Sequence, residues 1–70
     1  MVDVNFLIEL MVDNYGDISI YDYAVNKQVY FGSAKLCPIK YEFYDVLSFE
    51  ALLGEDGFPY IEINIETEEN

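Results

Sequence analysis

Residues 60–66 read Tyr-Ile-Glu-Ile-Asn-Ile-Glu, and this alternation of isoleucine with polar side chains decides the fold assignment. Successive side chains of a β-strand point to opposite faces, so a period of two predicts isoleucines on one face and carboxylates on the other. Residues 46–52 alternate in the same way, and the turn sequence Gly-Glu-Asp-Gly lies between the two segments at residues 54–57. We therefore predict a hairpin over residues 46–66.

The first half of the chain carries the pattern of a second hairpin. Residues 17–24 alternate apolar and polar side chains, Asn26-Lys27 has the composition of a tight turn, and residues 28–31 form the return strand. Asparagine suits such a turn because it tolerates the positive φ that two-residue loops require. Pairing Val25 with Gln28 then predicts one face with three tyrosines, Tyr21, Tyr23 and Tyr30. The opposite face would carry Ile18, Ile20, Ala24, Val29 and Phe31.

Short helical segments lie on both sides of this hairpin in the sequence. Residues 4–11 place apolar side chains at helical spacing, with Asp3 available as the N-cap and Gly16 available to end the segment. Pro38 breaks the chain and suits the start of a short helix over residues 38–44. The aromatic content of that segment leaves a strand as the alternative.

The order helix, hairpin, short helix, hairpin predicts a small single domain of the α+β class. Its two β-hairpins form a four-stranded, mainly antiparallel sheet, with one or two short helices on one face. We expect the domain to span residues 1–66, followed by a frayed acidic C-terminal tail over residues 67–70.

The composition excludes several classes of function. Fourteen acidic residues against three lysines, with no arginine or histidine, give a formal charge of −11. Proteins that bind nucleic acid or anionic membranes need basic side chains, so we expect neither as a direct partner. The chain is nevertheless 53% hydrophobic and 17% aromatic, which is typical of a folded domain and not of a disordered acidic tail.

Two isolated residues and the N-terminal sequence bear on chemistry and location. Cys37 is the single cysteine, so we expect no internal disulfide, a reduced cytoplasmic location and a core position for its side chain. The N-terminus lacks the features of a signal peptide, and no apolar run approaches the ~20 residues that span a bilayer. Asp22 falls on the apolar side of its strand, which suggests edge protection, a bulge or a site residue.

Catalytic machinery is not expected in this sequence. Nucleophilic catalysis on Cys37 lacks a histidine base, and no calcium-loop or phosphate-loop motif is present. We predict a protein that is not an enzyme and has no cofactor and no metal site.

Negative charge is concentrated in the second half of the chain. Residues 1–40 carry a net charge of −2, and residues 41–70 carry −9. Same-face residues on a strand recur about every 6.6–6.8 Å, so a row of carboxylates can imitate a row of phosphates. The candidate partner-binding set combines these acids with the tyrosine face: Tyr21, Tyr23, Tyr30, Glu42, Asp45, Glu50, Glu55, Asp56, Glu62 and Glu66.

Several segments resemble small uncharacterised proteins encoded by phages and prophages of Gram-positive bacteria. The resemblance covers about two thirds of the chain and is carried by Ile18-Ser19-Ile20-Tyr21-Asp22-Tyr23, Tyr30-Phe31-Gly32-Ser33-Ala34, Pro38, Val46-Leu47-Ser48-Phe49-Glu50 and Ile61-Glu62-Ile63. It implies an inhibitor of host defence or of host nucleic-acid enzymes, as anti-CRISPR proteins and other DNA mimics are. It also implies the cytoplasm of a bacterial host as the location.

These observations lead to one main hypothesis and two alternatives. The main hypothesis is that the acidic, tyrosine-containing surface docks in a basic groove of a host nucleic-acid-binding protein. In the first alternative, a homo-oligomer sequesters a nucleotide immune signal, with tyrosines stacked on bases and with Lys27, Lys35 and Lys40 near the phosphates. The second is a structural module that self-associates through its tyrosine face.

Overall fold

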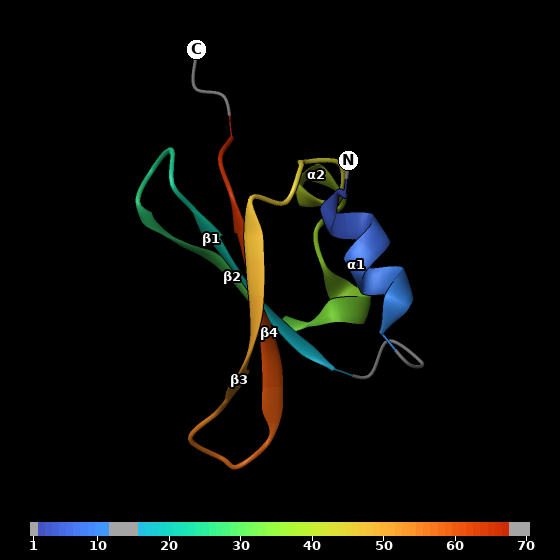
Figure 1. Ribbon diagram of the computed structural model, residues 1–70, viewed down its shortest axis with the longest axis vertical. Coiled ribbons are helices and arrows are strands. Elements are labelled where there is room, and N and C mark those ends of the chain that lie inside the picture. The colour runs from blue at the N-terminus through green and yellow to red at the C-terminus, as the bar shows by residue number, and fades with distance from the viewer. Residues whose placement is uncertain (1, 12–15, 68–70) are drawn as a thin grey trace.

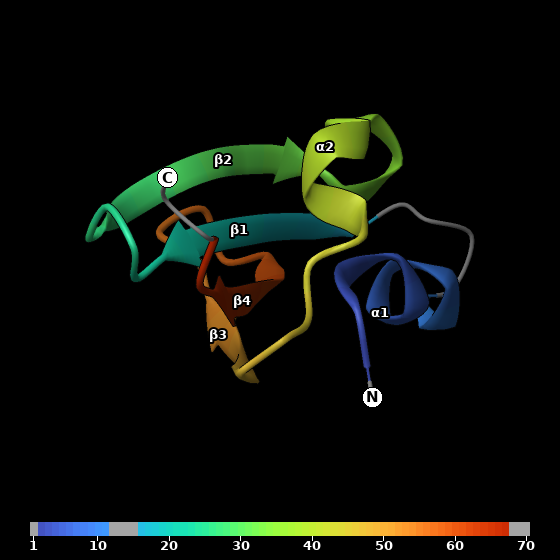
Figure 2. The same ribbon diagram turned by 90° about the horizontal axis from the view of Figure 1, so that it is seen from above.

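Four β-strands form one sheet, and the helical segments lie on one of its two faces (Figures 1 and 2). The computed structural model describes residues 2–11 and 16–67 of the 70-residue chain. The elements, in chain order, are α1 (Val4–Leu10), β1 (Asp17–Asp22), β2 (Lys27–Ser33), the 3-10 turn η2 (Ala34–Leu36), α2 (Ile39–Glu42), β3 (Ser48–Leu53) and β4 (Pro59–Ile65).

The strand order is β2-β1-β4-β3, so each hairpin contributes one central and one outer strand. The hairpins β1–β2 and β3–β4 are antiparallel, whereas the central pair β1–β4 is parallel. Parallel neighbours need a long connection, and here the chain crosses from β2 to β3 through η2 and α2. The predicted α+β domain is confirmed, and its sheet is mixed.

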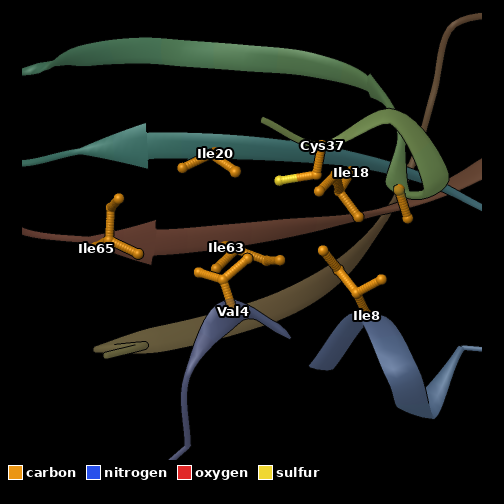
Figure 3. Packing of buried hydrophobic residues seen from close by; sticks show 8 residues of the cluster. Val4, Ile8, Ile18, Ile20, Cys37, Ile63 and Ile65 are labelled. Atoms are coloured by element: carbon orange, nitrogen blue, oxygen red, sulfur yellow. The ribbon is translucent and has the colours of Figure 1, made fainter. Parts of the chain in front are cut away.

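The core lies between the helices and the inner strands of the two hairpins. Ile18 and Ile20 of β1 and Ile63 of β4 are fully buried, and Val4 and Ile8 of α1 pack against them (Figure 3). The alternation of isoleucine therefore directs these side chains to the helix-covered face, as predicted. That face is called the core face below, and the opposite side of the sheet is called the open face.

The helix ends agree with the sequence prediction at one end of α1 and differ at the other. The Asp3 carboxylate accepts a hydrogen bond of 2.8 Å from the Phe6 amide and so caps α1, as predicted. The helix ends at Leu10, because Met11 adopts an extended backbone while its amide still bonds to the Ile8 carbonyl. Gly16 does not end it.

The segment after Pro38 also agrees with the helical prediction. It forms α2 over Ile39–Glu42, which rules out the alternative of a strand there. Pro38 caps this helix with an extended backbone, as suits a residue that fixes φ and has no amide hydrogen to donate.

The register of the first hairpin differs from the predicted one because the turn is longer than predicted and β2 contains a bulge. Ile20 pairs with Tyr30, but the next residue, Tyr21, pairs with Gln28, so Val29 is an extra residue in β2. A bulge places two residues opposite one and shifts the facing of the strand beyond it. The turn before it is also longer than predicted, covering residues 23–26, and Asn26 has the expected positive φ of 54°.

The bulge exchanges the faces of two neighbouring aromatic residues. Tyr30 lies on the core face, where its hydroxyl donates to the Ser33 carbonyl at 2.7 Å, and Phe31 lies on the open face opposite Ser19. The prediction for both residues was therefore wrong. β2 continues to Ser33, two residues beyond the predicted return strand of residues 28–31.

Asp22 links the first hairpin to the end of the second. Its carboxylate accepts hydrogen bonds from the Ala24 amide at 2.9 Å, the Thr67 amide at 3.1 Å and the Thr67 hydroxyl at 2.6 Å. Burial raises the pKa of Asp22, but the hydrogen bonds from Thr67 and Ala24 outweigh it and hold the pKa below its ordinary value.

Two predictions about this region are corrected by these contacts. Edge protection is wrong for Asp22, because β1 is a central strand. The buried carboxylate instead accepts hydrogen bonds from the backbone amides of Ala24 and Thr67. The predicted tail is not frayed at Thr67, which is bonded to Asp22. The rest of that tail, residues 68–70, lies outside the described residues.

Candidate binding surface

The open face of the sheet is the surface on which the predicted acids and aromatics meet. Both helices lie on the other side of the sheet (Figure 2). The strand registers give three open-face residues on each strand: Asp17, Ser19 and Tyr21 on β1, Gln28, Phe31 and Ser33 on β2, Ser48, Glu50 and Leu52 on β3, and Tyr60, Glu62 and Asn64 on β4.

Two carboxylates stand directly opposite each other on this face. Glu50 of β3 pairs with Glu62 of β4, and side chains paired in this way have Cβ atoms about 4.5–5.5 Å apart. Asp17 lies one strand over and two residues along from Glu62, because it pairs with Tyr60. The three acids therefore form a carboxylate row across β1, β4 and β3, in which Glu62 lies diagonal to Asp17 and directly opposite Glu50. Like charges that face each other directly, as Glu50 and Glu62 do, destabilise the sheet.

The basic residues lie elsewhere in the fold. Lys27 pairs with Asp22 at the start of β2, which places it on the core face, and Lys35 and Lys40 belong to η2 and α2. These are the three basic residues of the chain. The carboxylate row of the open face therefore has no lysine beside it on the four strands.

Two pairs of aromatic side chains lie on the β1–β2 side of the open face, next to the Asp17 and Glu62 part of the carboxylate row. The rings of Tyr21 and Tyr23 meet edge to face at 5.2 Å, and those of Phe31 and Tyr60 do so at 5.4 Å. Tyr23 lies just beyond the end of β1, and its ring contacts the ring of Tyr21 on the open face. Such pairs form rigid contact area with little side-chain entropy to lose on binding.

Sequence reasoning found part of this aromatic set. The prediction that Tyr21 shares a face with Glu50 and Glu62 agrees with the strand registers. Tyr30 is on the wrong side for the open face, and Phe31 was missed because of the bulge. Tyr60 was also missed, although it precedes Glu62 by two residues and the strand alternation already pointed to it.

Hydrogen bonds between neighbouring strands hold the polar middle of the open face. The Gln28 amide nitrogen donates to the Ser19 hydroxyl at 2.7 Å, and the Asn64 amide nitrogen donates to the Ser48 hydroxyl at 3.0 Å. Each bond joins the two strands of one hairpin. The polar side chains next to the acids are therefore held in place by hydrogen bonds to one another.

The remaining predicted acids are not all brought to this face. Glu42 belongs to α2, and Asp45 forms an isolated antiparallel bridge with Asp3 beside α1, so both lie with the helices. They were assigned to the wrong side because periodicity does not show where the connecting segment packs. Glu66 is exposed just beyond the end of β4.

The last two acids lie in the β3–β4 turn and line a hollow at one end of the open face. Asp56 accepts a hydrogen bond of 3.0 Å from the Phe58 amide and shapes this turn, while Glu55 is exposed beside it. The hollow has a volume of about 430 Å³ and is lined by Asp17, Phe31, Leu53, Gly54, Glu55, Asp56, Phe58 and Tyr60.

A second hollow, of about 340 Å³, lies on the helix side of the sheet. It combines Lys27 and Lys40 with Tyr41 and Tyr44, and the Lys40 ammonium lies 5.1 Å from the centre of the Tyr41 ring. Two of the three lysines in the chain are thus gathered at one site.

Cys37 is a core residue, as predicted. Its side chain is buried among the isoleucines (Figure 3), and burial, with the nearby Glu42 charge, raises the pKa of its thiol to about 11. The thiol therefore stays protonated at neutral pH, which leaves it a poor nucleophile. Within residues 2–11 and 16–67, no group of three or more acidic or cysteine side chains is arranged to hold a metal ion.

Comparison of the chain with protein-family models, with curated proteins and with solved structures finds no match. In the described part of the chain, no helix has the length and apolar character needed to cross a membrane. Any statement about function therefore rests on the charge, the aromatic side chains and the hollows of this fold.

Proposed function

We propose that this protein is a phage-type inhibitor that occupies the basic groove of a host nucleic-acid-processing or defence protein and imitates nucleic acid there. The observation that supports this most is the carboxylate row of Asp17, Glu62 and Glu50 on the open face of the sheet, with no lysine beside it. A CRISPR effector is one kind of target that fits.

The carboxylate row is costly to the free protein. Glu50 and Glu62 repel each other across the β3–β4 pair, and the formal charge of −11 on 70 residues adds a general repulsion. Lysine and arginine side chains of a basic groove would offset both terms. Binding in such a groove would therefore relieve the charge repulsion that destabilises the free protein.

The aromatic pairs supply what carboxylates alone lack. Charged rims steer encounter and set specificity, whereas most binding energy in interfaces comes from a few buried aromatic or arginine anchors. Tyr21, Phe31 and Tyr60 lie on the same face as the acids and are only partly covered. They would be buried by a groove that closes over the carboxylate row.

The test of this proposal is a charge reversal on the open face with a matched reversal elsewhere. The double variant Glu50→Lys/Glu62→Lys removes the row, and Glu9→Lys/Glu42→Lys makes the same change in net charge on the helices. Proteins retained from bacterial lysate at low and moderate salt are identified by mass spectrometry. Each is then purified and tested for displacement of a labelled oligonucleotide by this protein.

We expect the parent and the helix variant to displace the oligonucleotide, less strongly as salt rises, and the open-face variant to lose at least tenfold in potency. Equal potency of the two double variants contradicts the proposal, because the position of the carboxylates on the open face would then make no difference. A retained protein that binds no nucleic acid also contradicts it.

The helix-side hollow supports one alternative function, sequestration of a nucleotide. Lys27 and Lys40 would face the phosphates, and Tyr41 or Tyr44 would stack on the base. The check is chromatography of small molecules released when the purified protein is denatured. A nucleotide in stoichiometric amount supports sequestration, and its absence, together with no response to added dinucleotides in calorimetry, removes it.

A further inference from the structure

The hollow at the β3–β4 turn has aromatic walls, and two of its rings are largely exposed. Phe31 is 54% exposed and Phe58 is 70% exposed, although both are large apolar side chains. The rings of Phe31 and Tyr60 meet edge to face at 5.4 Å on one side of the hollow. These rings are held on three separate segments, β2, β4 and the turn between β3 and β4.

Carboxylates from two distant parts of the chain stand at the same hollow. Asp17 begins β1, and Glu55 and Asp56 lie in the β3–β4 turn. One oxygen of Asp56 already accepts the Phe58 backbone amide and so holds the turn in shape. Asp17, on a central strand, and Glu55, exposed in the turn, are then the acids that face an incoming group.

Aromatic walls with carboxylates at the rim match the chemistry of a guanidinium group. Guanidinium is planar, is weakly hydrated for a cation, stacks on aromatic rings and donates paired hydrogen bonds to carboxylates. Ligand hollows usually measure about 300–1,000 Å³. At about 430 Å³, this one has room for the whole side chain of an arginine.

We propose that this hollow accepts an arginine side chain of the basic partner, stacked against Phe31 and Tyr60 and bonded to Asp17 and Glu55. The inference rests on the proposed function and names the contact that sets the position of the partner on the open face. The hollow lies at the Asp17 end of the carboxylate row, so an arginine placed there leaves Glu62 and Glu50 free to meet further basic groups of the partner.

The inference is tested without the partner, by titrating the purified, isotope-labelled protein with N-acetyl-arginine methylamide and following backbone amides by NMR. The control ligand is N-acetyl-citrulline methylamide, which has nearly the same shape and no charge. We expect saturable shifts at Asp17, Phe31 and Tyr60 with the arginine ligand and at least tenfold weaker binding of citrulline. Equal binding of the two ligands, or shifts confined to other surfaces, overturns the assignment.

Variants separate the hollow from the general negative field. Asp17→Asn should weaken arginine binding severalfold, and Phe31→Leu should do the same while keeping an apolar side chain. Glu9→Gln on α1 removes one charge at a distance and should leave binding unchanged. Equal losses in Asp17→Asn and Glu9→Gln overturn the assignment, and a magnesium titration that gives the same shifts as arginine does so as well.

The two proposals fail in different ways. If the arginine ligand does not bind but the Glu50→Lys/Glu62→Lys variant still loses the partner, only the hollow has been assigned wrongly. If the arginine ligand binds as expected but that variant keeps its partner, the hollow remains and the proposed function falls.

Discussion

Strands β3 and β4 pair residue for residue and carry the same alternation, yet only β4 has fully buried side chains. Ile63 and Ile65 of β4 are fully buried, whereas Phe49 of β3, the direct partner of Ile63, is 56% exposed. The difference comes from their neighbours: β4 lies between β3 and β1, and β3 is an outer strand. Alternation thus specifies which way a side chain points and not how deeply it is covered.

The two strands consequently have different tasks. β4 contributes its isoleucines to the core and its acid Glu62 to the open face, so it serves both stability and the proposed binding. β3 contributes little to the core, and its acid Glu50 acts against stability by standing opposite Glu62. Three substitutions on these strands test this division, and a fourth, at Asp22 of β1, tests the hydrogen bonds that hold the segment after β4. They follow from the largest expected effect to the smallest.

The largest effect is expected for Ile63→Ala in the middle of β4. Its side chain is fully buried under α1, so truncation loses apolar burial and leaves a cavity. We expect the free energy of unfolding to fall by about 2–5 kcal/mol, measured by urea denaturation. A loss no greater than that of Phe49→Ala would contradict the contrast between the two strands.

The second effect concerns the hydrogen bonds that join Asp22 of the first hairpin to Thr67, just beyond the end of β4. Asp22→Asn keeps the shape of the side chain but removes the charge that accepts the Thr67 and Ala24 hydrogen bonds. We expect a loss of about 1–3 kcal/mol at neutral pH, again from urea denaturation.

This loss should depend on pH in a defined direction. The hydrogen bonds hold the pKa of Asp22 below its ordinary value, despite the opposing effect of burial. The stability it contributes is therefore complete above about pH 4 and disappears as the pH falls through the pKa of the folded state. The gap between parent and Asp22→Asn should close in acid, and a constant gap would contradict this role.

A smaller loss is expected for Phe49→Ala on β3. Full burial of such a side chain contributes about 1.5–3 kcal/mol, and about half of this ring is exposed, so we expect a loss of roughly 1 kcal/mol. Phe49 and Ile63 contact one apolar hollow beside α1, so the double variant should also be measured. Losses that add without coupling would show that the two partners pack independently.

The smallest effect is a gain in stability from Glu50→Lys. The substitution turns the like-charge pair with Glu62 into an opposite-charge pair, and we expect a gain of several tenths of a kcal/mol that diminishes with added salt. The control is Glu9→Lys, which makes the same charge change on α1. If both variants gain equally, net charge and not the cross-strand pair is responsible.

Much of the local structure followed from the sequence. Asp3 caps α1, the turn of residues 54–57 joins β3 to β4, and the isoleucines of residues 60–66 face the helices. These features depend on backbone geometry over a few residues, which is what periodicity and turn composition report.

The candidate surface was only partly accessible to such reasoning. One bulge residue, Val29, is enough to exchange the faces of Tyr30 and Phe31, because every residue beyond it changes side. The bond between Asp22 and Thr67 joins positions 45 residues apart. Glu42 and Asp45 lie on the helix side of the sheet because of where α2 packs. No pattern in the neighbouring sequence predicts that packing.

The sequence by itself determined the charge of −11, its concentration after residue 40, the two hairpins and the two-faced character of the last strand. The tertiary structure alone decided that β1 and β4 lie side by side in parallel, that β3 is an outer strand, and that Asp17 and Glu55 line one hollow. The reason is physical: strand and turn formation are set by neighbouring residues, whereas strand order is set by how both hairpins bury their isoleucines against the same helix.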